Sequence, residues 1–259
     1  MNKRVLILNI TSMNELPLME RWLLRDHISE NLSRTAPFLS RYLSYRVVPA
    51  PPEAIPYGYY NWRVTELWMR EPLPLGGTLK TTFPPGYDRI VVGQEGKPPY
   101  ATEWDGQPEG PHPPAICIVP VRPTEDFLGA DLRLTDKTIL RWLIAFKYPQ
   151  GVPVNEGEDW FLNVHSKEVL QQPGITRYYS HRTVDSPFPW HRLTEQWYEN
   201  FSGWRKSVID SSPSYAKPPW AKYQKYPFLQ PYSDFVSTFI LEYPTNDFLR
   251  DYHGYITGV

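Results

Sequence analysis

The sequence predicts an α+β protein made of two tandem repeats, each with the element order β-α-β-β-α-β. Two observations predict it. Blocks of similar sequence occur twice in the same order, and each copy alternates short apolar runs with helical segments. The paired blocks are ERWLLRDH (20–27) with EDWFLNVH (158–165), RYLSYR (41–46) with RYYSHR (177–182), RVTELWM (63–69) with RLTEQWY (192–198), and PTEDFL (123–128) with PTNDFL (244–249). The shared order indicates a duplication, with a first repeat at 1–130 and a second at 136–259.

Each copy begins with a strand and a helix. Apolar runs rich in β-branched residues predict first strands at 5–12 and 139–148. A helix follows each strand: no proline occurs between Met19 and Ala36, and Pro173-Gly174 ends the second helix.

Three more strands and a second helix complete the copy. The predicted strands are RYLSYRVV (41–48), NWRVTELWM (61–69) and AICIVPV (115–121), matched by ITRYYSHRTV (175–184), WHRLTEQWYE (190–199) and STFILEY (237–243). The second copy has its further helix at 199–211. This order is the ferredoxin-like arrangement, an antiparallel sheet with its helices on one face. Because the other face must be covered, we expect the two repeats to form a fused α+β barrel.

A proline- and glycine-rich insertion interrupts the first repeat. Residues 70–114 contain ten prolines and seven glycines where the second copy has its helix. We interpret the insertion as an ordered arm that closes a cleft or contacts a neighbouring subunit, and residues 211–232 as a second excursion.

The composition excludes several classes. A formal net charge of −1 argues against a large nucleic-acid footprint. The apolar run at 5–10 is too short for a membrane span or a signal peptide. The single cysteine, Cys117, excludes an internal disulfide or a thiolate metal cage, so we expect a cytoplasmic protein without a metal site.

Two histidines are candidate catalytic residues. His27 and His165 occupy equivalent positions in the two predicted first helices. An imidazole can accept and donate a proton near neutral pH, as isomerisation or cyclisation requires. The alternative is a shared structural role in the helix.

Candidate acids lie on the strands. Glu66 and Glu195 alternate onto an apolar strand face, where each is a general acid, a partner of a histidine, or half of a buried ion pair. Tyr45 of the first copy becomes His181 in the second, which also gains His191, and we expect both near His165.

Strand arginines are candidate ligands for a substrate carboxylate. They exceed the strand glutamates in number, so some are expected to bind an anion, while the alternative for each is an internal ion pair. The candidate substrate-binding residues are Arg41, Arg46, Arg177 and Arg182, with Trp68 and Trp197.

The helix with Trp and then His, the Pro-Gly turn, the Arg-Tyr strand and the Glu-x-Trp strand resemble the EthD-type branch of the dimeric α+β barrel proteins. The second copy matches better, because TAPF replaces the Pro-Gly turn in the first. The resemblance implies a small, often cofactor-free enzyme, with haem-using relatives. It also implies that His27 and His165 line a cleft.

These observations predict a cofactor-independent isomerase, lyase or hydrolase that acts on a small carboxylated, unsaturated or aromatic-derived catabolic intermediate. A helix histidine is the expected base, and a strand Glu or Tyr is the expected acid. The strand arginines are expected to bind the substrate carboxylate. The alternatives are a haem-binding barrel enzyme and a non-catalytic metabolite-binding protein. We expect no nucleic-acid or membrane partner, and a homodimer is compatible with the insertion.

Overall fold

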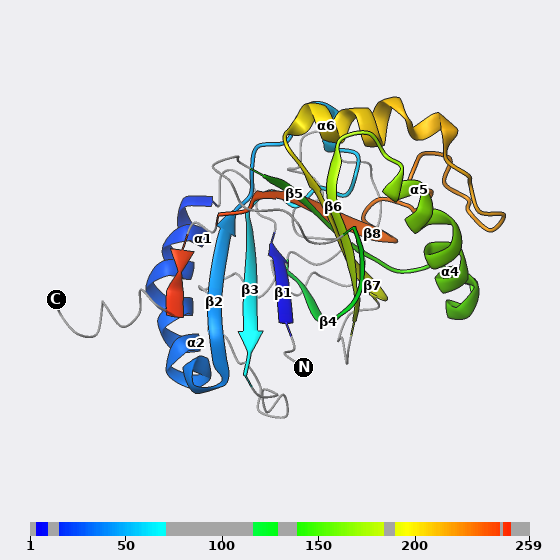
Figure 1. Cartoon of the computed structure of the whole chain (residues 1–259). Coiled ribbons are helices and arrows are strands. Elements are labelled where there is room, and N and C mark those ends of the chain that lie inside the picture. The colour runs from blue at the N-terminus through cyan, green and yellow to red at the C-terminus, as the bar shows by residue number, and fades with distance from the viewer. Residues whose placement is uncertain are drawn as a thin grey trace. The chain divides into compact units, whose positions relative to one another are not determined.

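The computed structural model describes residues 4–9, 16–70, 116–128, 139–183, 190–243 and 246–249 (Figure 1). The chain divides into two compact units. Unit 1 comprises Met1–Val47, Tyr60–Arg122 and Tyr243–Val259, and unit 2 comprises Val48–Tyr59 and Pro123–Glu242. Each unit therefore includes a segment whose sequence belongs to the other repeat.

Unit 1 contains an antiparallel sheet and one interrupted helix. The helical elements are α1 (Leu16–Trp22), the π-helical turn η1 (Leu23–His27), α2 (Ile28–Thr35) and the 3₁₀ turn η2 (Ala36–Phe38). The strands are β1 (Arg4–Asn9), β2 (Leu39–Arg46), β3 (Arg63–Met69), the first part of β4 (Ile116–Leu128) and β9 (Asn246–Asp247). They pair in the order β4-β1-β3-β2-β9.

Unit 2 shows the complete β-α-β-β-α-β order. Its helical elements are η3 (Pro52–Ala54), α4 (Val154–Trp160), η4 (Phe161–His165), α5 (Ser166–Leu170), α6 (Phe201–Arg205), η5 (Lys206–Asp210) and η6 (Ser212–Ser214). Its strands β5 (Leu140–Phe146), β6 (Ile175–Thr183), β7 (Arg192–Tyr198) and β8 (Phe235–Leu241) pair in the order β8-β5-β7-β6, all antiparallel. The predicted α+β class with antiparallel sheets is confirmed, as is the second helix of this copy.

The strand registers repeat between the units. Arg41 pairs with Trp68 in unit 1 as Arg177 pairs with Trp197 in unit 2. A register shift precedes each of these pairs, between Leu39 and Arg41 and between Ile175 and Arg177. A bulge kept at the same place in both copies shows that the repeated blocks are structurally equivalent.

Apolar helix faces pack on one face of each sheet. In unit 1, helix residues Met19, Trp22 and Leu32 pack in one cluster with strand residues Tyr42 and Leu67. In unit 2, the ring of Trp142 stacks on Phe239 at 5.8 Å, and Trp204 of α6 meets both rings edge-on at 5.7 and 5.3 Å. These ring contacts pack α6 against the sheet.

The predicted helix end at Pro173-Gly174 is confirmed, because α5 ends at Leu170. Gly174 has φ +84°, and a Cβ there would lie 3.0 Å from the Cα of Gly203. Both facts favour glycine at this turn. The predicted insertion at 70–114 lies, except for Arg70, outside the described residues.

Candidate functional site

A π-helical turn ends at a histidine in each unit. In η1 the amide of Ile28 donates to the carbonyl of Leu23, and in η4 the amide of Ser166 donates to the carbonyl of Phe161. These i→i+5 bonds widen the helix by one residue just before His27 and His165. Such turns within α-helices frequently mark functional sites.

A buried ion pair attaches the helix of unit 1 to its sheet. Glu20 accepts from Nε and Nη2 of Arg63, both at 2.7 Å, and from the indole nitrogen of Trp62 at 2.7 Å. Burial raises the pKa of Glu20, but the hydrogen bonds from Arg63 and Trp62 outweigh it, so the net shift is downward. Arg46 adds a longer contact to Glu20 at 3.7 Å.

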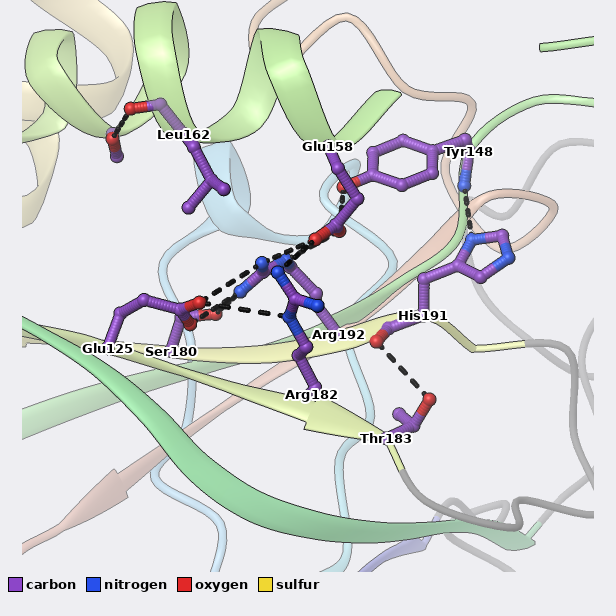
Figure 2. Close-up of polar contacts among 10 residues, drawn as sticks. Glu125, Tyr148, Glu158, Leu162, Ser180, Arg182, Thr183, His191 and Arg192 are labelled. Carbon is purple, nitrogen blue, oxygen red and sulfur yellow. Dashed lines mark hydrogen bonds and ion pairs between the residues drawn. The ribbon is translucent and has the colours of Figure 1, made fainter. Parts of the chain in front are cut away.

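The same pair recurs in unit 2 with more partners (Figure 2). Glu158 of α4 accepts from Nε and Nη2 of Arg192 at 2.7 and 2.6 Å, and the opposite carboxylate, Glu125, accepts from Nη1 at 2.7 Å. The hydroxyl of Tyr148 donates to Glu158 at 2.5 Å, and Nη2 of Arg182 lies 3.1 Å from Oε2 of Glu158. The sequence-predicted substrate-binding residues Arg46 and Arg182 therefore face protein carboxylates.

His27 is a half-buried, neutral imidazole. Its Nε2 lies 2.7 Å from the amide nitrogen of Asn31. An amide nitrogen only donates, so Nε2 accepts and the ring proton resides on Nδ1. The ring tilts against Trp22 with centroids 4.6 Å apart. Burial lowers the pKa of His27 to about 4, partly offset by the charge of Glu30.

His165 occupies the equivalent position but is enclosed. Its ring packs against Trp160 at 4.8 Å, Phe161 at 5.8 Å and Tyr226 at 5.6 Å, the last in a stacked arrangement. The residue is 6% exposed, and burial lowers its pKa to about 3. Tyr226 comes from the predicted excursion at 211–232, which in this unit covers the histidine.

A second polar network surrounds Glu195, on the sheet face opposite the helices. Glu195 is fully buried and accepts from Nη2 of Arg141 at 2.6 Å and from the hydroxyl of Tyr179 at 2.7 Å. Nε2 of His181 lies 3.1 Å from its other oxygen. We call these four residues the Glu195 network.

Trp197 lies beside this network between two guanidinium groups. Arg141 and Arg177 approach its ring centroid to 5.3 and 5.0 Å, and Arg177 also lies 4.9 Å from the ring of Tyr179. These contacts place the row Arg141, Trp197 and Arg177 across three adjacent strands. Cation–π contacts of this kind contribute about 0.5–2 kcal/mol each.

Unit 1 has different side chains at the positions equivalent to this network. The register aligns Glu66 with Leu43 where Glu195 aligns with Tyr179, and Val64 with Tyr45 where Leu193 aligns with His181. Glu66 accepts from the indole of Trp68 at 3.3 Å. Around its strand glutamate, the second copy therefore has Tyr179 in place of Leu43 and His181 in place of Tyr45.

The structure brings together some predicted residues and separates others. Glu195, His181, Arg177 and Trp197 share one sheet face, whereas Arg41 is exposed on β2. The sequence predicts that His181 and His191 lie near His165, and the structure gives the three rings different partners. His181 contacts Glu195, His191 accepts from the backbone amide of Tyr148 at 3.0 Å, and His165 packs among aromatic rings. Strand alternation places His181 on the sheet face opposite the helix that carries His165.

Two residues of the Glu195 network, Arg141 and Tyr179, were not among the predicted site residues. Arg141 pairs with Trp197 as Arg4 pairs with Trp68. The repeated arginine one strand away was the sequence signal that could have identified it.

Within the described residues, no group of three or more His, Cys, Asp or Glu side chains could hold a metal ion. Among the helices of that same part of the chain, none is long and apolar enough to cross a bilayer.

Two comparisons find similar proteins. Residues 1–90 match the family described as chalcone isomerase N-terminal domain. An anthrone oxidase-like protein of known structure is 8% identical over 95% of this chain and 92% of that chain, with a TM-score of 0.44. Chlorite dismutase from Candidatus Nitrospira defluvii is also 8% identical, over 97% and 94% of the two chains, with a TM-score of 0.44.

No curated protein matches the sequence. The resemblance to EthD-type proteins stays a prediction. In its first third the chain is similar to the chalcone isomerase N-terminal domain.

Proposed function

We propose that the protein is an enzyme that transfers protons on a small conjugated carbonyl compound, an isomerisation or ring closure, with His27 as the acid–base group. One observation carries the proposal. His27 is the only histidine within residues 1–90, the segment similar to the chalcone isomerase N-terminal domain, and it stands at the end of a π-helical turn.

The protonation state of His27 suits a base. With a pKa of about 4, its ring is neutral at pH 7, and Nε2 holds the free electron pair. A substrate hydroxyl or an acidic C–H that replaces the amide of Asn31 meets this electron pair. The imidazolium that forms is more acidic than an ordinary one, so it readily returns the proton to another atom of the same molecule. The substrate is rearranged without a change in its oxidation state.

His27 is a better candidate than His165. Both rings are neutral, but His27 is half-buried, whereas His165 is covered by Trp160, Phe161 and Tyr226. A base must come within hydrogen-bond distance of the proton that it removes. We infer that the second copy keeps the helix geometry and that its histidine is structural.

The Glu195 network supports the sheet in this proposal. Its carboxylate already accepts from Arg141 and Tyr179 and contacts His181. A carboxylate with these contacts is held in place and its oxygens are occupied by protein groups, so it is a poor candidate for the general acid.

Ultraviolet–visible time courses test the proposal. The full chain is incubated with hydroxychalcones, conjugated dienoic acids and unsaturated lactones, beside the variants His27→Gln and His165→Gln. We expect His27→Gln to reduce the rate roughly 100-fold or more, the usual contribution of a general base. His165→Gln should keep most of the rate.

Two results would contradict the proposal. A rate that survives in His27→Gln and disappears in His165→Gln would move the base to unit 2. Binding of these compounds with no reaction would indicate a binding protein. The spectrum of the protein alone reports any bound haem by its Soret band. Matched circular dichroism spectra confirm that both variants are folded.

A further inference from the structure

Unit 2 contains a pocket of about 480 Å³. Its lining includes Tyr226, which packs on His165, and no residue of the Glu195 network. Three segments far apart in the sequence line it. They contribute Tyr57, from the loop between β2 and β3, Ile209, near the end of η5, and Tyr223, Lys225 and Tyr226, from the 211–232 excursion. Phe235 at the start of β8 completes the apolar wall. A volume of this size accommodates a molecule of one or two rings.

The wall formed by Tyr57 is fixed in place. Its carbonyl accepts from the hydroxyl of Ser237 at 2.6 Å, and its ring meets Trp142 and Trp204 edge-on at 6.0 and 5.7 Å. The next residue, Gly58, has φ +66°, and a Cβ there would lie 2.7 Å from the carbonyl oxygen of Phe235. Only glycine fits so close to β8, so the ring of Tyr57 has a defined position.

The opposite wall is equally constrained. The hydroxyl of Tyr226 accepts from the amide of Gln172 at 2.8 Å, and its ring packs against Tyr215 at 4.4 Å. Two aromatic residues beyond it, Phe228 and Tyr232, have φ of 68° and 63°. This left-handed conformation costs a bulky residue about 1–3 kcal/mol, and such strain clusters at ligand sites.

The polar groups of the pocket leave room for a hydrogen-bond acceptor. The hydroxyls of Tyr57 and Tyr223 make no hydrogen bond to the described part of the chain, and burial raises the pKa of both, that of Tyr57 to about 12. They are therefore protonated donors at pH 7. Glu53 is neutralised by its ion pair with Arg205, whereas Lys225 forms no ion pair with any described residue. The charge available to a ligand is positive.

We propose that this pocket binds a planar aromatic molecule with one anionic group, a carboxylate or a phenolate. The ring of the ligand packs on the aromatic walls. The anionic group meets the ammonium of Lys225 and accepts from the phenols of Tyr57 and Tyr223. The site shares no residue with the His27 turn, so it is a second small-molecule site and does not depend on the function proposed above.

Calorimetric titration of the full chain tests the site. The probe is 4-hydroxycinnamate, its uncharged control is 4-hydroxycinnamyl alcohol, and the His27→Gln background prevents turnover. Ile209→Trp should fill the pocket and weaken binding at least tenfold. Lys225→Gln should lower the affinity for the acid about tenfold, the loss expected for one charge-assisted contact, and leave the affinity for the alcohol unchanged. Lys222→Gln, an exposed lysine that does not line the pocket, is the matched control.

Equal affinities for Ile209→Trp, Lys225→Gln and Lys222→Gln would overturn the proposal, as would the absence of binding at millimolar probe. Thermal melts accompany each titration. If Ile209→Trp melts early, Tyr223→Leu at the half-buried rim replaces it, and a tenfold loss for the acid is again the supporting result.

Discussion

Glu158 and Arg192 form a bidentate ion pair, with Oε1 2.7 Å from Nε and Oε2 2.6 Å from Nη2. The guanidinium also separates Glu158 from Glu125. Removing one partner of a buried pair costs about 3–5 kcal/mol, because an uncompensated charge stays behind. Here Glu158 and Glu125 are partly exposed and keep their contacts with Arg182. We expect Arg192→Met to lower the free energy of unfolding by at most this amount, measured by urea denaturation.

Glu158→Gln is the matched variant for this pair, because Arg192 keeps Glu125 as its partner and the loss should be smaller. An Arg192→Met protein that is as stable as the wild type would show that the pair contributes nothing to folding.

The two helix histidines predict an acid-sensitive fold. Their folded-state pKa values, about 4 for His27 and about 3 for His165, lie below the usual 6.5. The unfolded chain therefore binds more protons as pH falls below 6.5, and stability is lost in that direction. Each histidine should contribute a slope of up to about 1.4 kcal/mol per pH unit.

Urea midpoints between pH 6.5 and about 5 measure this effect above the ordinary pKa of carboxyl groups. His191, whose pKa burial also lowers, adds to the slope in the same direction. The double variant His27→Gln, His165→Gln should flatten the profile. If its slope equals that of the wild type, other groups govern the acid response.

Gly157 should not tolerate alanine, although it lies within helix α4. In an exposed helix, alanine would stabilise by about 1 kcal/mol. Here a Cβ would lie 2.3–2.5 Å from ring atoms of Tyr148, whose hydroxyl is bound to Glu158. We expect Gly157→Ala to destabilise by about 1–3 kcal/mol. A higher melting temperature for this variant would show that the ring of Tyr148 can move.

Helix α6 begins with a side-chain cap. Oδ1 of Asn200 accepts from the amide of Gly203 at 3.1 Å. Asn200→Ala should lower stability by about 0.5–2 kcal/mol, and Asn200→Asp should restore most of it. Chemical denaturation of the two variants side by side checks this, and an aspartate as unstable as the alanine would exclude capping as the cause.

Much of the fold could be predicted from the sequence, because apolar runs and duplicated blocks report strands and repeats directly. The end of β4 could not be predicted in this way. The run at 115–121 is followed by Pro123, which usually ends a strand, yet β4 continues to Leu128.

The site was predicted in part. Strand alternation in the sequence places Glu195 on the same face as Leu193 and Trp197. Its partners His181 and Arg141 come from neighbouring strands, so they depend on a register that only pairing of the strands sets. The π-helical turns were also invisible, since residue types do not distinguish an i→i+5 bond from an i→i+4 bond.

The division of the chain into units decides whether the two repeats can be separated by a single cut. Unit 2 takes Val48–Tyr59 from the first repeat, and unit 1 takes Tyr243–Val259 from the second. A cut between the repeats would thus give two fragments that each lack a part of their own unit. The fragment from residue 136 onward would lose the Tyr57 carbonyl that Ser237 binds and the Glu125 carboxylate that Arg192 binds. Neither repeat taken alone therefore contains a whole unit.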